Sequence, residues 1–332
     1  MTDAPSFPSL VQYFFAQHLC TNKQVSPKTI AAYRDTFRLL LSFMQGQTGR
    51  PASALRITDL DAPSVLAFLD YLETQRGNKA RSRNARLYAI RSFFRVIALR
   101  DPANMAIVDR VMAIPCKRTT KPMIRYLTRE EIDSILAVPD QTTWVGSRDH
   151  ALFLTLYNTG ARASEITQMR CDQVSFGSST FVRLHGKGRK ERTVPLWPQT
   201  ARVLRQWFRK LGSTDQDLAF PAVRGGPLSN DGLDHALQRA IEEAIAECPS
   251  LNKKHVSPHV IRHTTAMHLL QSGVDIAVIA LWLGHESIET THGYIEADLN
   301  MKERALAKLT PAKGRMSRFE PGDDLLQFLK GL

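Results

Sequence analysis

The sequence predicts a mainly α-helical protein with two domains and one small antiparallel β element. Three observations point to this class. Apolar residues recur with helical spacing along most of the chain. Two short β-prone runs, 180–184 and 192–196, flank a glycine-bearing turn. A basic segment with two prolines, 113–125, separates the first third of the 332 residues from the rest and is typical of an extended linker.

The first hundred residues predict a small bundle of helices. One helix is expected around residues 10–19. Ser26, with a proline directly after it, is typical of a helix start, and this helix is expected to end at Gly46. A further helix begins after Asp61. The last covers about 82–100, where apolar residues form a stripe at i, i+3, i+7 and i+10.

The second part of the chain predicts an α-rich domain that contains the β element. Thr128 and Glu131 match a capping box at its first helix. The two β-prone runs are expected to pair as a hairpin around the turn HGKGRKE. Further helices are expected near residues 147–158, 199–211, 230–247, 259–272 and 276–283.

The charge of the chain suggests a polyanionic partner. Lys and Arg number 44 against 32 Asp and Glu, a formal net charge of +12. Double-stranded DNA would fit this surplus, because Lys and Arg that neutralise phosphates release condensed counterions. A solvated basic surface fits net charge alone equally well. Placement favours DNA: the stretch 76–100 holds eight basic residues and no acidic one, whereas a solvated face normally mixes both signs. The candidate DNA-binding residues are Lys79, Arg81, Arg83, Arg86, Arg91 and Arg95.

Composition also argues against several classes of protein. The longest apolar stretch, 276–283, is about half of what a bilayer-spanning helix needs, so no membrane association is expected. The first residues do not have the pattern of a secretion signal. The four cysteines are scattered and form no C-x-x-C pair, which argues against a disulfide framework. These features predict a cytoplasmic protein.

Two local patterns supply basic groups at turns. TGARASEI places Arg162 after a glycine, at the start of a predicted helix, where a guanidinium can bind an anion. GKGRKER places Lys187 at the tip of the hairpin, and its spacing is not that of a nucleotide-binding P-loop. Each also has a plain structural explanation: Arg162 could pair with Glu165 on the surface, and Lys187 could lie in a solvated turn.

A third pattern, SPHVIRHTTAMHLL, places His259, Arg262 and His263 within one helical turn of each other. A zinc site is conceivable because His255, His259 and His263 recur every four residues. However, Pro258 starts the helix after His255, no H-E-x-x-H motif occurs, and no cysteine or suitably spaced carboxylate completes a ligand set. No metal is expected.

The fourth pattern, LWLGHESIETTHGY, places His285 after a glycine that ends an apolar helix, with Tyr294 nine residues further on. With the other patterns, it makes a set of two guanidinium groups, one amine, two imidazoles and one phenol. The set suits attack on a phosphodiester, because the arginines can neutralise phosphate oxygens without a metal. His259 could help the phenol to ionise, and the lysine could protonate the leaving oxygen.

The order of these residues resembles that of the tyrosine recombinase family, which includes phage integrases and Xer-like enzymes, over about residues 8–309. The resemblance implies a catalytic set of Arg162, Lys187, His259, Arg262, His285 and Tyr294. In the family the two arginines bind the phosphate, the lysine is the general acid and the first histidine transfers a proton. The second histidine binds the scissile phosphate, and the tyrosine is the nucleophile. Glu165 matches an acidic position that supports the first arginine.

The resemblance also implies an architecture. Residues 1–112 would form a SAM-like helical core-binding domain, 113–125 the basic linker, and 126–310 the α-rich catalytic domain with a small antiparallel β-sheet. The two domains would close around double-stranded DNA as a C-shaped clamp. The protein would act as a homotetramer, a dimer at each site, without cofactor, metal or ATP. The tail, 311–332, has one apolar helical face and is expected to dock on a neighbouring subunit.

These features are interpreted as those of a site-specific DNA recombinase that cuts and rejoins strands through a 3′-phosphotyrosyl intermediate, as the integrase or transposase of a mobile element. One alternative is a non-catalytic DNA-binding accessory protein, against which the complete catalytic set argues. Another is Xer-type chromosome-dimer resolution. A relaxing topoisomerase with similar chemistry agrees less well with the N-terminal bundle. The sequence does not identify the target DNA site or a partner recombinase.

Overall fold

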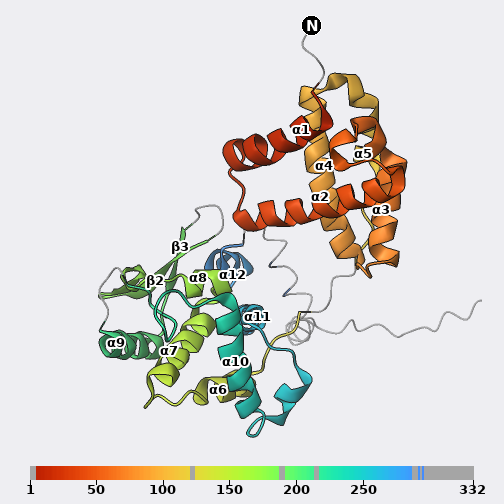
Figure 1. The fold of residues 1–332 in the computed structure, drawn as a ribbon. Helices are drawn as coiled ribbons and strands as arrows, with labels where there is room; N and C mark the ends of the chain where they lie inside the picture. The colour runs from red at the N-terminus through yellow and green to blue at the C-terminus, as the bar shows by residue number, and fades with distance from the viewer. Residues whose placement is uncertain are drawn as a thin grey trace, which may run out of the picture. The chain divides into compact units, whose positions relative to one another are not determined.

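The computed structural model describes residues 5–119, 124–186, 191–212 and 217–285, together with Thr291 and Tyr294. Lys187 and the predicted tail, 311–332, lie outside the described residues. The chain divides into two compact units, Met1–Pro122 and Met123–Leu332 (Figure 1). Both consist mostly of helices, as the sequence predicts.

The regular secondary structure in the described part of the first unit is entirely helical. They are α1 (Phe7–Tyr13), which continues as a π-helix (Phe14–Asn22), α2 (Pro27–Thr48), α3 (Ala62–Thr74), α4 (Ala80–Arg100) and α5 (Met105–Ala113). Short 3-10 turns cover Ala52–Ala54, Ile57–Leu60 and Pro102–Asn104. In the core, the rings of Phe14, Phe37 and Phe93 meet at centroid distances of 5.2 to 5.7 Å. Helices from both ends of the unit therefore share one aromatic core.

The predicted helices of this unit are present, but one of them ends later than predicted and one further helix was not predicted. The predicted end of α2 at Gly46 is wrong, because a single glycine is tolerated inside a helix. The helix ends instead before Gly49, whose φ of 66° gives the left-handed cap that glycine favours. The sequence did not predict α5, which covers the stretch just before the proposed linker.

The second unit combines helices with a small sheet. The helices are α6 (Arg129–Ala137), α7 (Trp144–Thr159), α8 (Ala163–Thr167), α9 (Pro198–Leu211), α10 (Asn230–Ala244), α11 (Pro258–Gln271) and α12 (Ile276–Leu283). Short 3-10 turns cover Cys171–Gln173 and Pro249–Lys253. None of the helices in the described part of the chain is long and apolar enough to cross a membrane.

The sheet of this unit has three antiparallel strands in the order β1 (Val174–Phe176), β2 (Thr180–His185) and β3 (Glu191–Pro195). The predicted hairpin is confirmed, with His185 opposite Glu191 at its closed end. Side chains alternate across β2, so that Val182 and Leu184 are buried while Arg183 is exposed. The inward face packs with α7 in one apolar core. The Asn158 amide, near the end of α7, donates to the carbonyl of Pro195 at 3.2 Å, so the end of β3 lies beside the end of α7.

Gly160, at the end of α7, lies in a crowded part of the unit. Its φ is 58°, and a Cβ added there would lie 2.6 Å from Cδ2 of Leu283. Gly212, which ends α9, has a similar φ of 63°, but no described atom lies within 4 Å of its added Cβ. Both glycines have a left-handed backbone, but only Gly160 is crowded. Comparing substitutions at the two positions therefore distinguishes the cost of backbone strain from the cost of crowding.

We predict that Gly160→Ala destabilises the protein far more than Gly212→Ala. The left-handed backbone conformation should cost about 1 kcal/mol in both variants, and overpacking should add roughly 1 to 3 kcal/mol at Gly160 alone. Urea unfolding of the full chain, followed by circular dichroism, measures the difference. Equal losses of stability in the two variants would contradict the packing described for Leu283.

Candidate active site

The candidate site starts where α7 ends. Gly160 turns the chain in a left-handed conformation, Ala161 is buried, and Arg162 is the N-cap residue of the next helix, α8. The glycine is required because α11 and α12 approach it closely through Thr265 and Leu283. The sequence prediction of a glycine turn followed by an arginine at a helix start is therefore confirmed.

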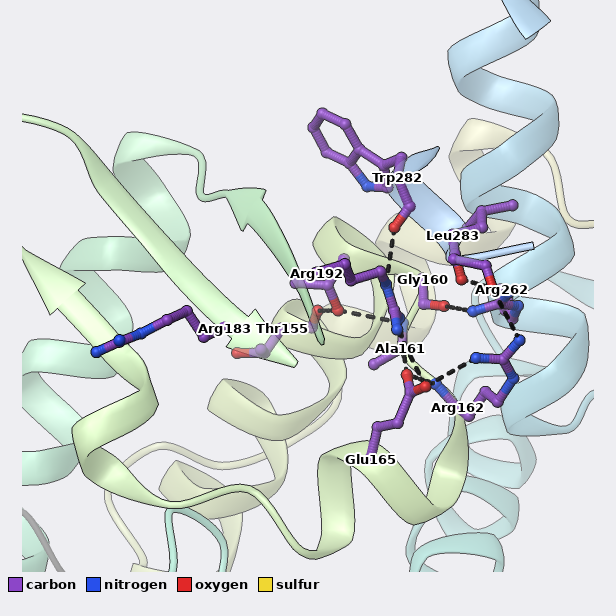
Figure 2. Close-up of polar contacts among 12 residues, drawn as sticks. Thr155, Gly160, Ala161, Arg162, Glu165, Arg183, Arg192, Arg262, Trp282 and Leu283 are labelled. Carbon is purple, nitrogen blue, oxygen red and sulfur yellow. Dashed lines mark hydrogen bonds and ion pairs between the residues drawn. The ribbon is translucent and has the colours of Figure 1, made fainter. Parts of the chain in front are cut away.

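One buried carboxylate organises the basic groups of this region. The Glu165 side chain, 3% exposed, accepts hydrogen bonds from Nη1 of Arg162 at 2.8 Å and from the Arg162 backbone N–H at 2.9 Å. Arg192 donates to both oxygens of the same carboxylate, at 3.0 and 2.7 Å. Figure 2 shows Glu165 between the two guanidinium groups. Burial alone would raise the pKa of Glu165, but the hydrogen bonds and charge of Arg192, together with Arg162, outweigh it and hold this pKa below its usual value.

Arg192 is the residue of this site that the sequence analysis missed. It lies at the start of β3, and its Nε also donates to the Trp282 carbonyl in α12 at 2.9 Å. A signal was available: alternation along β3 puts Arg192 on the same face as Val194, which is buried. A charge on the core side of a strand needs a partner of opposite charge. Glu165, three residues after a predicted site residue, is that partner.

Arg262 is buried, with 2% of its surface exposed, and is held by backbone groups. Its Nη1 donates to the Gly160 carbonyl at 2.6 Å and its Nη2 to the Leu283 carbonyl at 2.7 Å (Figure 2). Both carbonyls lie at helix C-termini, where the helix dipole favours a cation. Burial, followed by the charges of Arg162 and Arg192, lowers the pKa of Arg262 to about 10, so it remains protonated at neutral pH.

A second cluster contains His259, His285 and Tyr294 of the predicted set, together with His263, which is outside that set. On α11, the rings of His259 and His263 lie 4.4 Å apart between centroids. The hydroxyl of Tyr294 is 2.8 Å from Nδ1 of His263, and its ring stacks on His285 at 6.2 Å. Tyr294 is 2% exposed. The sequence singled out His259 to help the phenol, whereas here the hydroxyl contacts His263, one turn further along the helix.

These groups are all uncharged at neutral pH. Burial raises the pKa of Tyr294 to about 12. Burial, with smaller effects from nearby basic groups, lowers the pKa values of His263 and His285 to about 4 each and also lowers that of His259. The phenol therefore keeps its proton, and the imidazoles stay neutral.

The six candidate DNA-binding residues of the first unit differ in exposure. Lys79, Arg81 and Arg95 are exposed, while Arg86 and Arg91 are half-buried. Arg86 donates to the hydroxyl of Thr36 at 3.1 Å, and Arg91 donates to the Ile114 carbonyl. Arg83 is 3% exposed, so its side chain faces the interior of the unit rather than solvent.

The buried Arg83 belongs to a set of contacts that fasten the chain after α5 to α4. Its Nη1 donates to the Pro115 carbonyl at 3.1 Å, and its Nε lies 3.7 Å from a carboxylate oxygen of Glu73. The Asn84 amide makes two hydrogen bonds with the backbone of Lys117, at 2.8 and 3.0 Å, and the Lys117 amine pairs with Glu73 at 2.7 Å. The first residues of the proposed linker are thus packed against α4.

No group of three or more His, Cys, Asp or Glu that could hold a metal ion occurs among the described residues. His255 lies before α11 and is exposed. A cavity of about 430 Å³ lies elsewhere in the second unit, between α6, α7 and the start of α9, and is lined by Arg129, Tyr157 and Trp197 among others. None of its lining residues belongs to the predicted catalytic set.

Comparison with known proteins identifies the family. Residues 125–301 match the phage integrase family, and residues 13–100 match the phage integrase N-terminal SAM-like domain. A Sinorhizobium fredii protein named "Putative integrase/recombinase y4rC" is 50% identical over 332 residues, all of both chains. Tyrosine recombinase XerC of Oceanobacillus iheyensis is 32% identical over 313 residues, 91% of this chain and 97% of that protein. This chain belongs to the tyrosine recombinase family.

Solved recombinases have the same fold. The XerH site-specific recombinase bound to palindromic difH substrate matches with a TM-score of 0.65 at 20% identity, covering 84% of this chain and 79% of that one. The Tn1549 transposon integrase, in complex with a circular intermediate DNA, matches with a TM-score of 0.66 at 15% identity, covering 90% and 99%. The expected fold class, two helical domains with a small antiparallel sheet in the second, is thus confirmed.

We predict that Arg192→Met lowers the free energy of unfolding at pH 7 by about 3 kcal/mol, since it leaves Glu165 buried with one guanidinium instead of two. Arg183→Met is the matched control, because Arg183 also lies in the hairpin but points away from the cluster (Figure 2). It should change stability by less than about 0.5 kcal/mol.

The same variant should alter the pH dependence of stability. A carboxylate with a lowered pKa stabilises the fold above its unfolded pKa, and this contribution is lost as the pH falls. Wild type should therefore lose more stability than Arg192→Met between pH 7 and pH 4. Urea unfolding at the two pH values measures this; an equal loss in both proteins would contradict the role given to Arg192.

Proposed function

We propose that this tyrosine recombinase cuts and rejoins DNA at a specific site through a 3′-phosphotyrosyl link to Tyr294, as the integrase or transposase of a mobile element. One observation carries the proposal most: Arg162 and Arg262, far apart in sequence, are both anchored at the end of α7, within electrostatic range of each other. Two fixed guanidinium groups at one place are suited to a phosphate.

In this proposal the arginines stabilise the charge that develops on the phosphate. The Arg162 side chain is 37% exposed and can meet the DNA directly. Arg262 lies deeper, where its charge is less screened by water. Both are held before DNA arrives, so little reorganisation is needed during the reaction.

The remaining residues would move protons. Tyr294 must lose a proton to attack, and His259, which is exposed and uncharged, can accept it directly or through water. His285 would bind the scissile phosphate. Lys187, whose structure is not described, would protonate the departing 5′ oxygen. The phosphotyrosine retains the energy of the broken bond, so the reaction would need neither ATP nor a metal.

The comparisons support double-stranded DNA as substrate, because the matched XerH and Tn1549 integrase structures contain DNA. They support a mobile element because a relative named as an integrase/recombinase matches along the whole chain. Xer-type chromosome-dimer resolution is the second candidate, favoured by the similarity to XerC. In either role we propose a homotetramer on DNA, with a dimer at each site, to which the tail 311–332 would contribute contacts.

We predict a covalent protein–DNA adduct on Tyr294. Full-length protein is incubated in EDTA with nicked suicide duplexes made from the ends of its source element, and the adduct is resolved on a denaturing gel. Tyr294→Phe should abolish the adduct because it removes the nucleophilic oxygen. Tyr157→Phe, at another buried tyrosine of the same unit, should retain it. An adduct that persists in Tyr294→Phe, or no wild-type adduct with any end sequence, argues against the proposal.

We also predict that exposed and buried arginines of α4 differ in their effects. Arg95→Gln should reduce the slope of log K against log salt for DNA binding by about 1, because one phosphate contact is lost. Arg83→Gln should instead lower stability by about 1 to 3 kcal/mol through its broken buried contacts. Fluorescence anisotropy at several salt concentrations and urea unfolding measure the two effects. If Arg83→Gln changed the salt dependence of DNA binding but not the stability, Arg83 would be a DNA-contacting residue and our interpretation of it as a buried structural residue would be wrong.

A further inference from the structure

The Tyr294 hydroxyl is held in the interior of the second unit. Tyr294 belongs to one buried apolar cluster with Met267 and Leu270 of α11 and Ile279 and Leu283 of α12. Its single polar side-chain atom is 2.8 Å from Nδ1 of His263. A buried hydroxyl without a partner is costly, so this contact makes the burial of the ring favourable.

This arrangement is incompatible with attack on DNA. A nucleophilic oxygen must come within about 3 to 3.5 Å of the phosphorus, and a duplex cannot reach a tyrosine that is 2% exposed. Among the described residues, no hydrogen bond links the Tyr294 hydroxyl to Arg162 or Arg262. The hydroxyl must therefore leave His263 before cleavage.

We propose that His263 is a positioning residue that holds the Tyr294 hydroxyl in a closed, unreactive place in the DNA-free protein. The inference rests on the function proposed for Tyr294, and it adds a residue outside the predicted catalytic set. His263 acts through Tyr294 and does not touch the phosphate.

Acid–base properties support a restraint rather than a proton transfer. Burial raises the pKa of Tyr294 to about 12 and lowers that of His263 to about 4, with further lowering of the latter by His259 and Arg262. Because the pKa of Tyr294 is far above that of His263, transfer of the phenol proton to His263 is strongly unfavourable. The contact is therefore a hydrogen bond between neutral groups. An interaction present in the resting state and absent in the reactive state slows the reaction.

The test compares substitutions that remove or keep a polar atom at the position of Nδ1. His263→Leu removes it, and His263→Phe keeps a ring without it. His263→Asn is the matched control, since its amide places an oxygen or nitrogen there and can either donate or accept. DNA-free, full-length proteins are treated with tetranitromethane, and nitration of each tyrosine is measured by peptide mass spectrometry.

Tyr88, which is 55% exposed, is the internal standard for reactivity, and the buried Tyr157 reports general unfolding. We expect nitration of Tyr294 relative to Tyr88 to rise roughly 3- to 10-fold in His263→Leu and His263→Phe, the range that loss of one hydrogen bond gives, and to stay within about twofold of wild type in His263→Asn. Unchanged nitration of Tyr294 in both variants that lack the atom overturns the proposal. The proposal is also overturned if nitration of Tyr157 rises in parallel, or if nitration of Tyr294 rises equally in His263→Asn.

A second readout is the single-turnover rate of adduct formation with the suicide duplex. His263→Leu should form the adduct roughly 3- to 10-fold faster than wild type at saturating DNA, with unchanged DNA affinity, and His263→Asn should behave as wild type. A slower reaction in His263→Leu would make His263 part of the chemistry and overturn the restraint. Nitration needs no DNA, so an adduct that persists in Tyr294→Phe would reject the proposed function separately.

Discussion

The geometry of the site depends on the Glu165 carboxylate, which holds two guanidinium groups while buried. In the described part of the cluster, three guanidinium groups, those of Arg162, Arg192 and Arg262, accompany this one carboxylate. The third is held by two backbone carbonyls, which orient it without neutralising it. The cluster therefore keeps an excess of positive charge in a partly desolvated place. Such an excess is costly in the free protein, and a phosphate would relieve it.

The same contacts explain why the site requires the whole second unit to be folded. Arg192 joins β3 to α8 and α12, and Arg262 joins α11 to the ends of α7 and α12. The residues in contact span positions 160 to 284, so no local segment can form the site alone. Gly160 allows this convergence, because a side chain at that position would overlap Leu283. Fold stability and the placement of the guanidinium groups are thus properties of one set of contacts.

The sequence predicted the helices well because their apolar stripes and caps are local signals, and it identified Arg162 and Arg262 from their motifs. It missed Arg192, whose importance depends on pairing with Glu165, 27 residues earlier in the chain. It also treated Arg83 as a surface residue. The helical stripe that begins at Leu87 already places Arg83, one turn earlier, on the buried face of α4. What the sequence lacked was the partner, the chain around Pro115, which no local pattern places against this helix.

Two adjacent residues on α11 face different parts of the site. Arg262 faces the carbonyls of Gly160 and Leu283, whereas its neighbour His263 faces Tyr294. Because no hydrogen bond links Arg262 to Tyr294 in the described part of the chain, release of the phenol would leave the contacts of Arg162 and Arg262 unchanged. Opening then loses one hydrogen bond between neutral groups and the burial of one ring, whereas the charge-assisted contacts around Glu165 are kept. In the proposal, a movement of Tyr294 therefore completes a site whose basic part is already assembled.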